Sequence, residues 1–159
     1  MAYTFAGLLF CLFKPRALAA ILFAILIGYW ALMSFGPIRD IQLTKSGLAQ
    51  AAEKAGDPKT AALFQEGGNP STVKNSPMWE AAEKMYLSTT NTVTGKFDPG
   101  YNLSDHMDFR FLPGKKYDQF YDPEGIVSTL PAIATCLLGV FAGLLLRNSN
   151  VPDTRKLAH

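Results

Sequence analysis

The sequence has few residues of the kinds that usually build catalytic or metal centres. It contains 2 cysteines and 2 histidines among 159 residues, and both cysteines, Cys11 and Cys136, lie inside apolar segments. Neither cysteine is placed for a disulfide outside a membrane, so both are interpreted as small buried apolar residues. There is also no Gly-rich phosphate loop, no zinc-ligand pattern, no Ser-His-Asp arrangement and no internal repeat. The sequence therefore points to no metal site and to no cofactor.

Charge is absent from two long segments near the ends of the chain. Residues 17–36 read ALAAILFAILIGYWALMSFG and residues 126–146 read IVSTLPAIATCLLGVFAGLLL, and neither segment holds a charged side chain. As a helix the second segment would rise about 31 Å, close to the thickness of a bilayer core. Tyr29, Trp30 and Phe35 lie in the second half of the first segment, where interfacial aromatic residues are expected. The two segments predict an all-α integral membrane protein with two full transmembrane helices.

The second span has a helix-start signal and a matching stop signal. Asp122 suits the N-cap, Pro123 the first helical position and Glu124 the first turn, while Arg147 complements the opposite end of the helix dipole. Capping explains both carboxylates, although they also lie at the membrane boundary, where the active site of a membrane enzyme could open. Pro131 is expected to bend this helix, and the carbonyl that it frees needs a polar partner.

A third apolar block, residues 1–13, is too short to span a bilayer, because as a helix it would rise only about 20 Å. It lacks a basic beginning and a small-residue cleavage site, so it does not resemble a signal peptide. Two interpretations remain open. The block is an interfacial or half-inserted helix, or it is the second half of a spanning helix whose first half is missing from this chain.

The basic residues outside the middle segment predict the orientation. Segment 37–124 carries 10 basic and 12 acidic residues, whereas the flanks carry 5 basic residues and 1 acid. The positive-inside rule places both flanks in the cytoplasm and segment 37–124 outside, in a periplasm or its topological equivalent. The predicted parts are a partial apolar helix with a span (1–36), an external helical segment (37–124), a second span (125–147) and a cytoplasmic tail (148–159).

The external segment is expected to be helical and rich in loops, and too short and interrupted for a large core of its own. Helix caps and stops divide it, and no strand pattern persists for more than a few residues. The predicted helices are a stripe from Leu48 that ends at Gly56, a helix from Asp57-Pro58 to Gly67-Gly68, one opened by Ser76-Pro77, and one from an Asn102 cap that ends at Pro113-Gly114.

His106 is the internal histidine, and it lies between two acids, Asp105 and Asp108. A helix would put the two carboxylates on adjacent positions of one face and turn His106 about 100° away from Asp105. This is not a metal-ligand spacing such as His-x-x-x-His. His106 is therefore interpreted as a solvated surface histidine, with a catalytic or metal role as the alternative.

A basic and aromatic run precedes the second span, with Lys115 and Lys116 followed by Tyr117, Phe120 and Tyr121. Such a run suits the headgroup zone of the outer leaflet, so membrane lipid is an expected partner. It is not interpreted as a nucleic-acid site, because the predicted orientation places it in the wrong compartment.

Small residues recur at four-residue spacing in both spans and permit close helix packing. Ala20, Ala24 and Gly28 form one such stripe, and Gly139 and Gly143 form the other. The stripes are consistent with the two spans packing on each other or on helices of other membrane subunits. Side chains that could hydrogen-bond across such a contact are Ser128, Thr129 and Thr135.

Two stretches of the chain resemble a known family. Residues 121–143, YDPEGIVSTLPAIATCLLGVFAG, look like a block of the bacterial relatives of heparan-alpha-glucosaminide N-acetyltransferase, which are multi-spanning proteins of the transmembrane acyltransferase type. Residues 2–16 and 28–38 resemble the two helices that precede this block. The family also has a short helix just ahead of this block, and the residues here that resemble it are Asn102-Leu103, Asp105 and Leu112-Pro113-Gly114.

The resemblance implies a protein of a bacterial inner membrane, in a family that moves an acetyl group from acetyl-coenzyme A to an amino sugar. The family's catalytic histidine lies on an earlier helix that has no counterpart here, and residues 39–100 look like an insertion. No catalytic residue is therefore assigned, and the cofactor-binding residues stay unknown. The positions that carry over, as a candidate lining of the external cavity, are Asp122–Gly125 with Ser128 and Thr129.

Three hypotheses follow from the sequence. The first is a non-catalytic accessory subunit of a larger membrane complex, derived from an acyltransferase-like protein. The second is a fragment of a longer transmembrane acetyltransferase. The third, a small lipid- or pigment-contacting protein of an energy-converting complex, is permitted by the aromatic spans, although no span contains an axial-ligand histidine.

Overall fold

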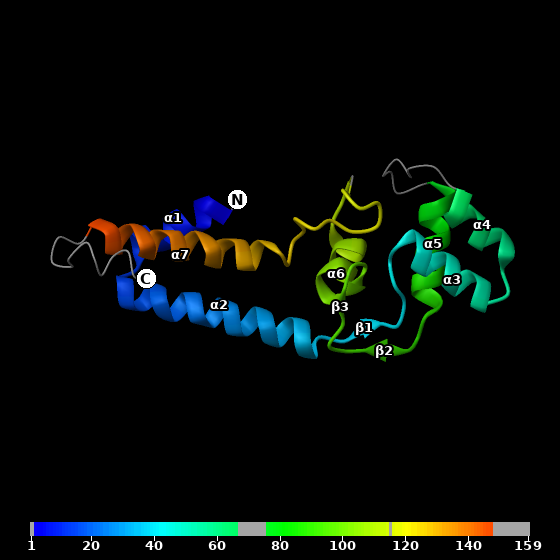
Figure 1. Ribbon diagram of the computed structural model, residues 1–159, viewed down its shortest axis with the longest axis horizontal. Coiled ribbons are helices and arrows are strands. Elements are labelled where there is room, and N and C mark those ends of the chain that lie inside the picture. The colour runs from blue at the N-terminus through cyan, green and yellow to red at the C-terminus, as the bar shows by residue number, and fades with distance from the viewer. Residues whose placement is uncertain (1, 67–75, 115, 148–159) are drawn as a thin grey trace. The chain divides into compact units, whose positions relative to one another are not determined.

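The computed structural model forms two compact units, which are described separately (Figure 1). Residues 1–29 and 129–159 belong to the first unit, called the apolar-helix unit, and residues 30–128 form the second, called the central unit. The residues that the structure describes are 2–66, 76–114 and 116–147. The predicted tail 148–159 lies outside them.

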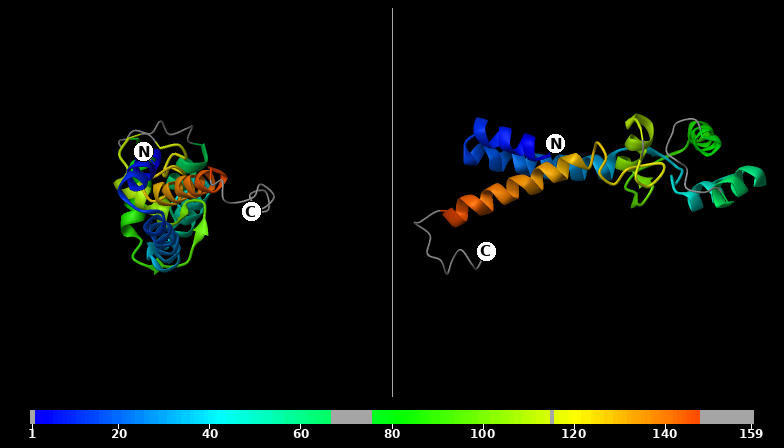
Figure 2. Two further views of the ribbon diagram at one scale, coloured as in Figure 1. Left: turned by 90° about the vertical axis from the view of Figure 1, so that its left-hand side faces the viewer. Right: turned by 90° about the horizontal axis from the view of Figure 1, so that it is seen from above.

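The apolar-helix unit is built from α1 (Ala2–Leu12), most of α2 (Pro15–Phe35) and α7 (Thr129–Arg147). α1 packs against α7, and the blue and orange helices lie side by side in Figures 1 and 2. Their shared apolar cluster consists of Ala6, Leu18, Leu22, Ala134 and Leu137. These helices therefore pack through aliphatic side chains.

Two of these helices, α2 and α7, are long and apolar enough to cross a membrane, as predicted. Only 17% of the most apolar 18-residue window is buried in each of them. Large side chains such as Phe23, Ile27 and Leu138 are exposed on their surfaces. A water-soluble protein rarely leaves such an apolar surface uncovered.

The start of α7 differs from the prediction. The helix begins at Thr129, so Asp122 is not its N-cap and Pro123 and Glu124 are not its first residues. Asp122 instead closes a local turn, in which its Oδ1 accepts a hydrogen bond from the Glu124 N–H at 3.0 Å. Pro131 consequently lies in the first turn of α7, where a missing N–H costs no intrahelical hydrogen bond. The prediction that Pro131 bends the interior of this helix was therefore wrong, because the helix begins only two residues before it.

Three helices of the central unit begin where their capping residues predicted, namely α4 (Pro58–Glu66), α5 (Pro77–Ser88) and α6 (Leu103–Phe111). The first helix, α3 (Lys45–Lys54), begins three residues before the predicted stripe from Leu48, and Thr44 is its N-cap. Asp57, Ser76 and Asn102 each accept a hydrogen bond from the backbone N–H three residues further on. The predicted stop at residues 67 and 68 lies outside the described residues.

Short strands join these helices. β1 (Ile38–Arg39) pairs antiparallel with β2 (Thr92–Val93), and Ile38 lies opposite Val93. β3 (Phe97–Asp98) pairs antiparallel with β4 (Tyr101–Asn102) across a turn that contains Gly100 at φ +70°. The first pair ties the segment after α2 to the segment after α5.

The central unit has a substantial apolar core, so the expectation of little core was wrong. Side chains from α3, α4, α5, α6 and the following loop meet in one buried cluster. Aromatic rings dominate it, and Trp79 stacks on Phe109 with ring centroids 4.7 Å apart and on Phe120 at 6.0 Å. Each buried aromatic side chain removes roughly 150–250 Å² from water, so a few of them give a short segment a large core.

Candidate functional site

The polar side chains of α6 are buried rather than solvated. Ser104, Asp105, His106 and Asp108 are all buried, and His106 is only 3% exposed. The prediction of a solvated surface histidine was therefore wrong. This burial could not be predicted locally, because the helix is polar on several sides and is covered by segments distant in the chain, including Ile41 and the loop around Gly125.

His106 is held as a neutral side chain. Its Nε2 lies 3.1 Å from the carbonyl oxygen of Ile41, so the ring donates this hydrogen bond and Nε2 carries the proton. Its ring lies 5.5 Å from that of Tyr86, and its Nδ1 has no hydrogen-bond partner among the described residues. Burial lowers the pKa of His106 to about 4, and the charge of Arg39 acts in the same direction.

Asp105 stabilises the turn before α6. Its Oδ2 accepts hydrogen bonds from the Gly100 N–H and from Nδ2 of Asn102, each at 2.7 Å. Burial raises the pKa of Asp105 to about 6, and these two hydrogen bonds only partly oppose the shift. The carboxyl group thus takes up a proton under mildly acidic conditions.

Asp108 is fully buried beneath the loop that contains Gly125 and Ile126. Its Oδ1 accepts a hydrogen bond from the Ile126 N–H at 2.9 Å, whereas Oδ2 has no partner among the described residues. Burial raises the pKa of this carboxyl group as well. Gly125 lies so close that an added Cβ would meet Oδ2 at 1.7 Å. We call this contact of Asp108 with Gly125 and Ile126 the Asp108 clamp.

Lys116 is buried, at 2% exposure, so its predicted place among lipid headgroups was wrong. Its ammonium group lies 4.1 Å from the ring centroid of Trp79 and donates a hydrogen bond to the Phe109 carbonyl oxygen at 3.3 Å. Phe120 is buried in the same core, while Tyr117 is exposed. Lys115 lies outside the described residues. The core therefore stabilises one cation through the face of an indole ring.

Replacing Lys116 with methionine should test this buried cation, because methionine keeps most of the side-chain volume. We expect the unfolding free energy to fall by about 1 kcal/mol, since the cation–π contact and the hydrogen bond to Phe109 are lost. Trp79 fluorescence, measured in a Trp30→Phe background, should shift in Lys116→Met. The exposed Lys84→Met should leave both quantities unchanged, and an equal change in both variants would contradict the assignment.

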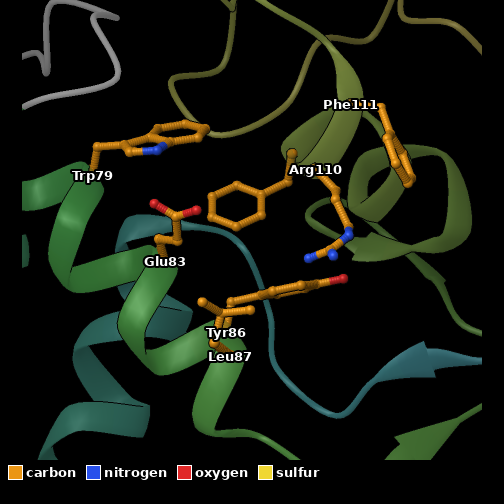
Figure 3. A pocket seen from close by; sticks show the side chains of 7 residues that line it. Trp79, Glu83, Tyr86, Leu87, Arg110 and Phe111 are labelled. Atoms are coloured by element: carbon orange, nitrogen blue, oxygen red, sulfur yellow. The ribbon is translucent and has the colours of Figure 1, made fainter.

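Two adjoining hollows open beside α5 and α6. The first has a volume of about 290 Å³ and is lined mainly by aromatic and charged side chains (Figure 3). The second, of about 360 Å³, includes residues of β1 and β2. Tyr86, Arg110 and Phe111 line both hollows. Figure 3 shows the Arg110 guanidinium directed toward the ring of Tyr86, and the Glu83 side chain extending from α5 between Trp79 and Tyr86.

The four residues predicted to lie at the membrane boundary are found in the loop before α7 and at the first position of α7. Asp122 is half-buried and its Oδ2 accepts a hydrogen bond from the Tyr117 N–H at 3.4 Å, while Glu124 is exposed. Ser128 donates to the Gly125 carbonyl oxygen at 3.0 Å, and Thr129 begins α7. The structure thus brings the motif together around the Asp108 clamp.

The small-residue stripes are exposed within this chain. Ala20, Ala24 and Gly28 on α2 have exposed surfaces, as do Gly139 and Gly143 on α7. A Cβ added at any of the three glycines would have no atom within 4 Å. The stripes therefore do not pack on each other, and the alternative that they meet other helices stays a prediction.

Sequence reasoning missed the residues that line the two hollows. Arg39 comes from β1, Tyr86 from α5 and Arg110 from α6, and no short motif joins them. Among the described residues, no group of three or more His, Cys, Asp or Glu side chains is arranged to hold a metal ion.

Comparison with known proteins gives no relative for this arrangement. The chain matches no protein-family model, no curated protein and no solved structure. The resemblance to transmembrane acyltransferases thus stays a prediction based on the motifs alone.

Proposed function

We propose that the chain is a non-catalytic, membrane-anchored subunit that packs its apolar helices onto a larger membrane assembly. The observation that supports this most is the exposed apolar surface of α2 and α7, each of which has only 17% of its apolar window buried. Lipid and neighbouring apolar helices are the environments that accommodate such surfaces. The charge distribution favours cytoplasmic flanks and a periplasmic segment 37–124 in a bacterial inner membrane.

The exposed small-residue stripes support assembly with other helices. In a bilayer, apolar side chains gain little by leaving lipid, so helix association depends on close backbone approach at glycine and alanine. The stripe of Gly139 and Gly143 is open to such an approach. The stripe of Ala20, Ala24 and Gly28 offers a second surface of the same kind.

The intact mass of the native polypeptide, measured with the proteins that copurify in mild detergent, tests this proposal. We expect the chain to comigrate with partner subunits at fixed stoichiometry. The double variant Gly139→Leu/Gly143→Leu should reduce the copurified partner at least several-fold, because bulky side chains prevent close approach. Ala142→Leu adds similar bulk beside the stripe and serves as the control. A stable isolated monomer, or extraction by alkaline carbonate, would overturn the proposal.

A second candidate is a segment of a transmembrane acetyltransferase that moves acetyl from acetyl-coenzyme A to an amino sugar. The favouring observation is that two stretches with the resemblance pack together, since Gly125 and Ile126 close over Asp108 of the short helix α6. In the same mass measurement, this candidate predicts these peptides within a much larger polypeptide.

A further inference from the structure

We propose that the second hollow, lined by Arg39 and Arg110, binds the phosphate group of a phosphate ester, with a phospholipid headgroup as the source that the fold favours. We call it the arginine hollow. Its volume of about 360 Å³ suits a small polar group rather than a large ligand.

The charge of the arginine hollow favours an anion. Its described lining includes Arg39 and Arg110 and no aspartate or glutamate. His106 also contributes to the wall but is held neutral, as described above. Thr92 and Tyr86 add hydroxyl groups, which can donate hydrogen bonds to phosphate oxygens. The hollow therefore offers two positive charges and neutral donors.

Arg39 is held in place before any ligand arrives. Its Nη1 donates to the carbonyl oxygens of Tyr86, Leu87 and Thr89 at 2.8, 2.9 and 2.6 Å, where α5 ends. Its guanidinium carbon lies 4.9 Å from the ring centroid of Tyr86. Among the described residues, Nε and Nη2 have no hydrogen-bond partner, so part of its planar donor set stays available to an anion.

Arg110 is the second donor. It is exposed on α6, and its described contact is with the ring of the adjacent Phe111, 5.9 Å from the guanidinium carbon. Figure 3 shows its guanidinium directed toward Tyr86, the ring that Arg39 also contacts. Arginine binds phosphate through two parallel hydrogen bonds, so an anion beside Tyr86 could engage both side chains.

The position of the arginine hollow favours a lipid headgroup. Its wall begins at Pro37, two residues after the end of α2 at Phe35. If α2 crosses the bilayer, which rests on the proposed function, the hollow lies at the level of the headgroup phosphates. Phe111 lines the hollow and is exposed, and Phe35, two residues before Pro37 in the chain, is exposed as well, so both offer apolar contacts for the lipid. A water-soluble phosphate ester shares the same chemistry without this requirement.

Binding by the full-length protein in mild detergent tests the proposal with two probes. Native mass spectrometry with added phosphatidylglycerol measures retained lipid, and calorimetry at low salt measures binding of glycerol 3-phosphate. We expect Arg110→Gln to weaken binding about ten-fold, because a charge-assisted bidentate contact is lost. Glu83→Gln, in the adjoining hollow, should strengthen binding about two-fold by removing a nearby negative charge.

Lys84→Gln is the matched control, because Lys84 is exposed on α5 but lines a different hollow. Retention of phosphatidylglycerol alone identifies the headgroup, and binding of glycerol 3-phosphate as well identifies the shared phosphate chemistry. Binding of neither probe, or equal losses in Arg110→Gln and Lys84→Gln, would overturn the proposal. The glycerol 3-phosphate measurement needs no membrane, so its result is independent of whether the chain joins a larger assembly.

Discussion

Gly125→Ala is expected to lower the unfolding free energy of the central unit by roughly 3 kcal/mol or more. An added Cβ would lie 1.7 Å from Oδ2 of Asp108 and 2.2 Å from its Cγ. Non-bonded atoms do not approach one another so closely, and Asp108 is fully buried, so either the loop or the carboxylate must move. Either movement breaks the 2.9 Å hydrogen bond from Ile126 and leaves a buried carboxylate with less compensation.

The loss should be measured by urea unfolding followed through Trp79 fluorescence, in a Trp30→Phe background. Gly114→Ala is the control, because Gly114 has φ +84° but no atom within 4 Å of an added Cβ. This substitution should lower the unfolding free energy by only about 1 kcal/mol, because alanine is disfavoured in the left-handed backbone conformation. The double variant Asp108→Ala/Gly125→Ala should recover part of the loss. Additive effects of the two single substitutions would refute the clamp.

His106→Gln and Asp105→Asn should change the pH dependence of stability in opposite directions. The pKa of His106 is about 4 in the folded protein, against an ordinary value of 6.5. As pH falls through this interval the unfolded chain binds the proton first, so this group destabilises the folded state. The pKa of Asp105 is raised from 3.8 to about 6, so the folded state binds the proton first and gains stability as pH falls.

One pKa unit corresponds to about 1.4 kcal/mol, so each group contributes on the order of 3 kcal/mol between pH 4 and 6.5. The two contributions nearly cancel in the parent protein. Removing His106 should make the central unit more stable toward pH 4, since the raised pKa values of Asp105 and Asp108 then act unopposed. Removing Asp105 should make it less stable toward pH 4.

Urea unfolding midpoints between pH 4 and 7 check this expectation. Glutamine at position 106 keeps a donor for the Ile41 carbonyl, and asparagine at position 105 keeps an acceptor for Gly100. The exposed pair Glu124→Gln and Lys84→Gln controls for general charge effects and should leave the slope unchanged. Parallel pH profiles for His106→Gln and Asp105→Asn would show that these groups are not buried as described.

The candidate binding site could not be predicted from the sequence. Arg39 and Arg110 lie on β1 and α6, and Tyr86, which both approach, lies on α5. Their meeting depends on the pairing of β1 with β2 and on the packing of α5 against α6 through Tyr86 and Phe109. Contacts between residues so far apart in the chain carry no local signal.

What the sequence determined by itself was local. An uncharged run is long enough to span a bilayer whatever surrounds it, and Asp57, Ser76 and Asn102 cap helices through backbone groups three residues away. Tertiary structure alone decided the burial of Asp108 and the late start of α7, because both depend on the contact of α6 with Gly125 and Ile126. Local signals fix where a helix can form, whereas burial depends on which distant segments cover it.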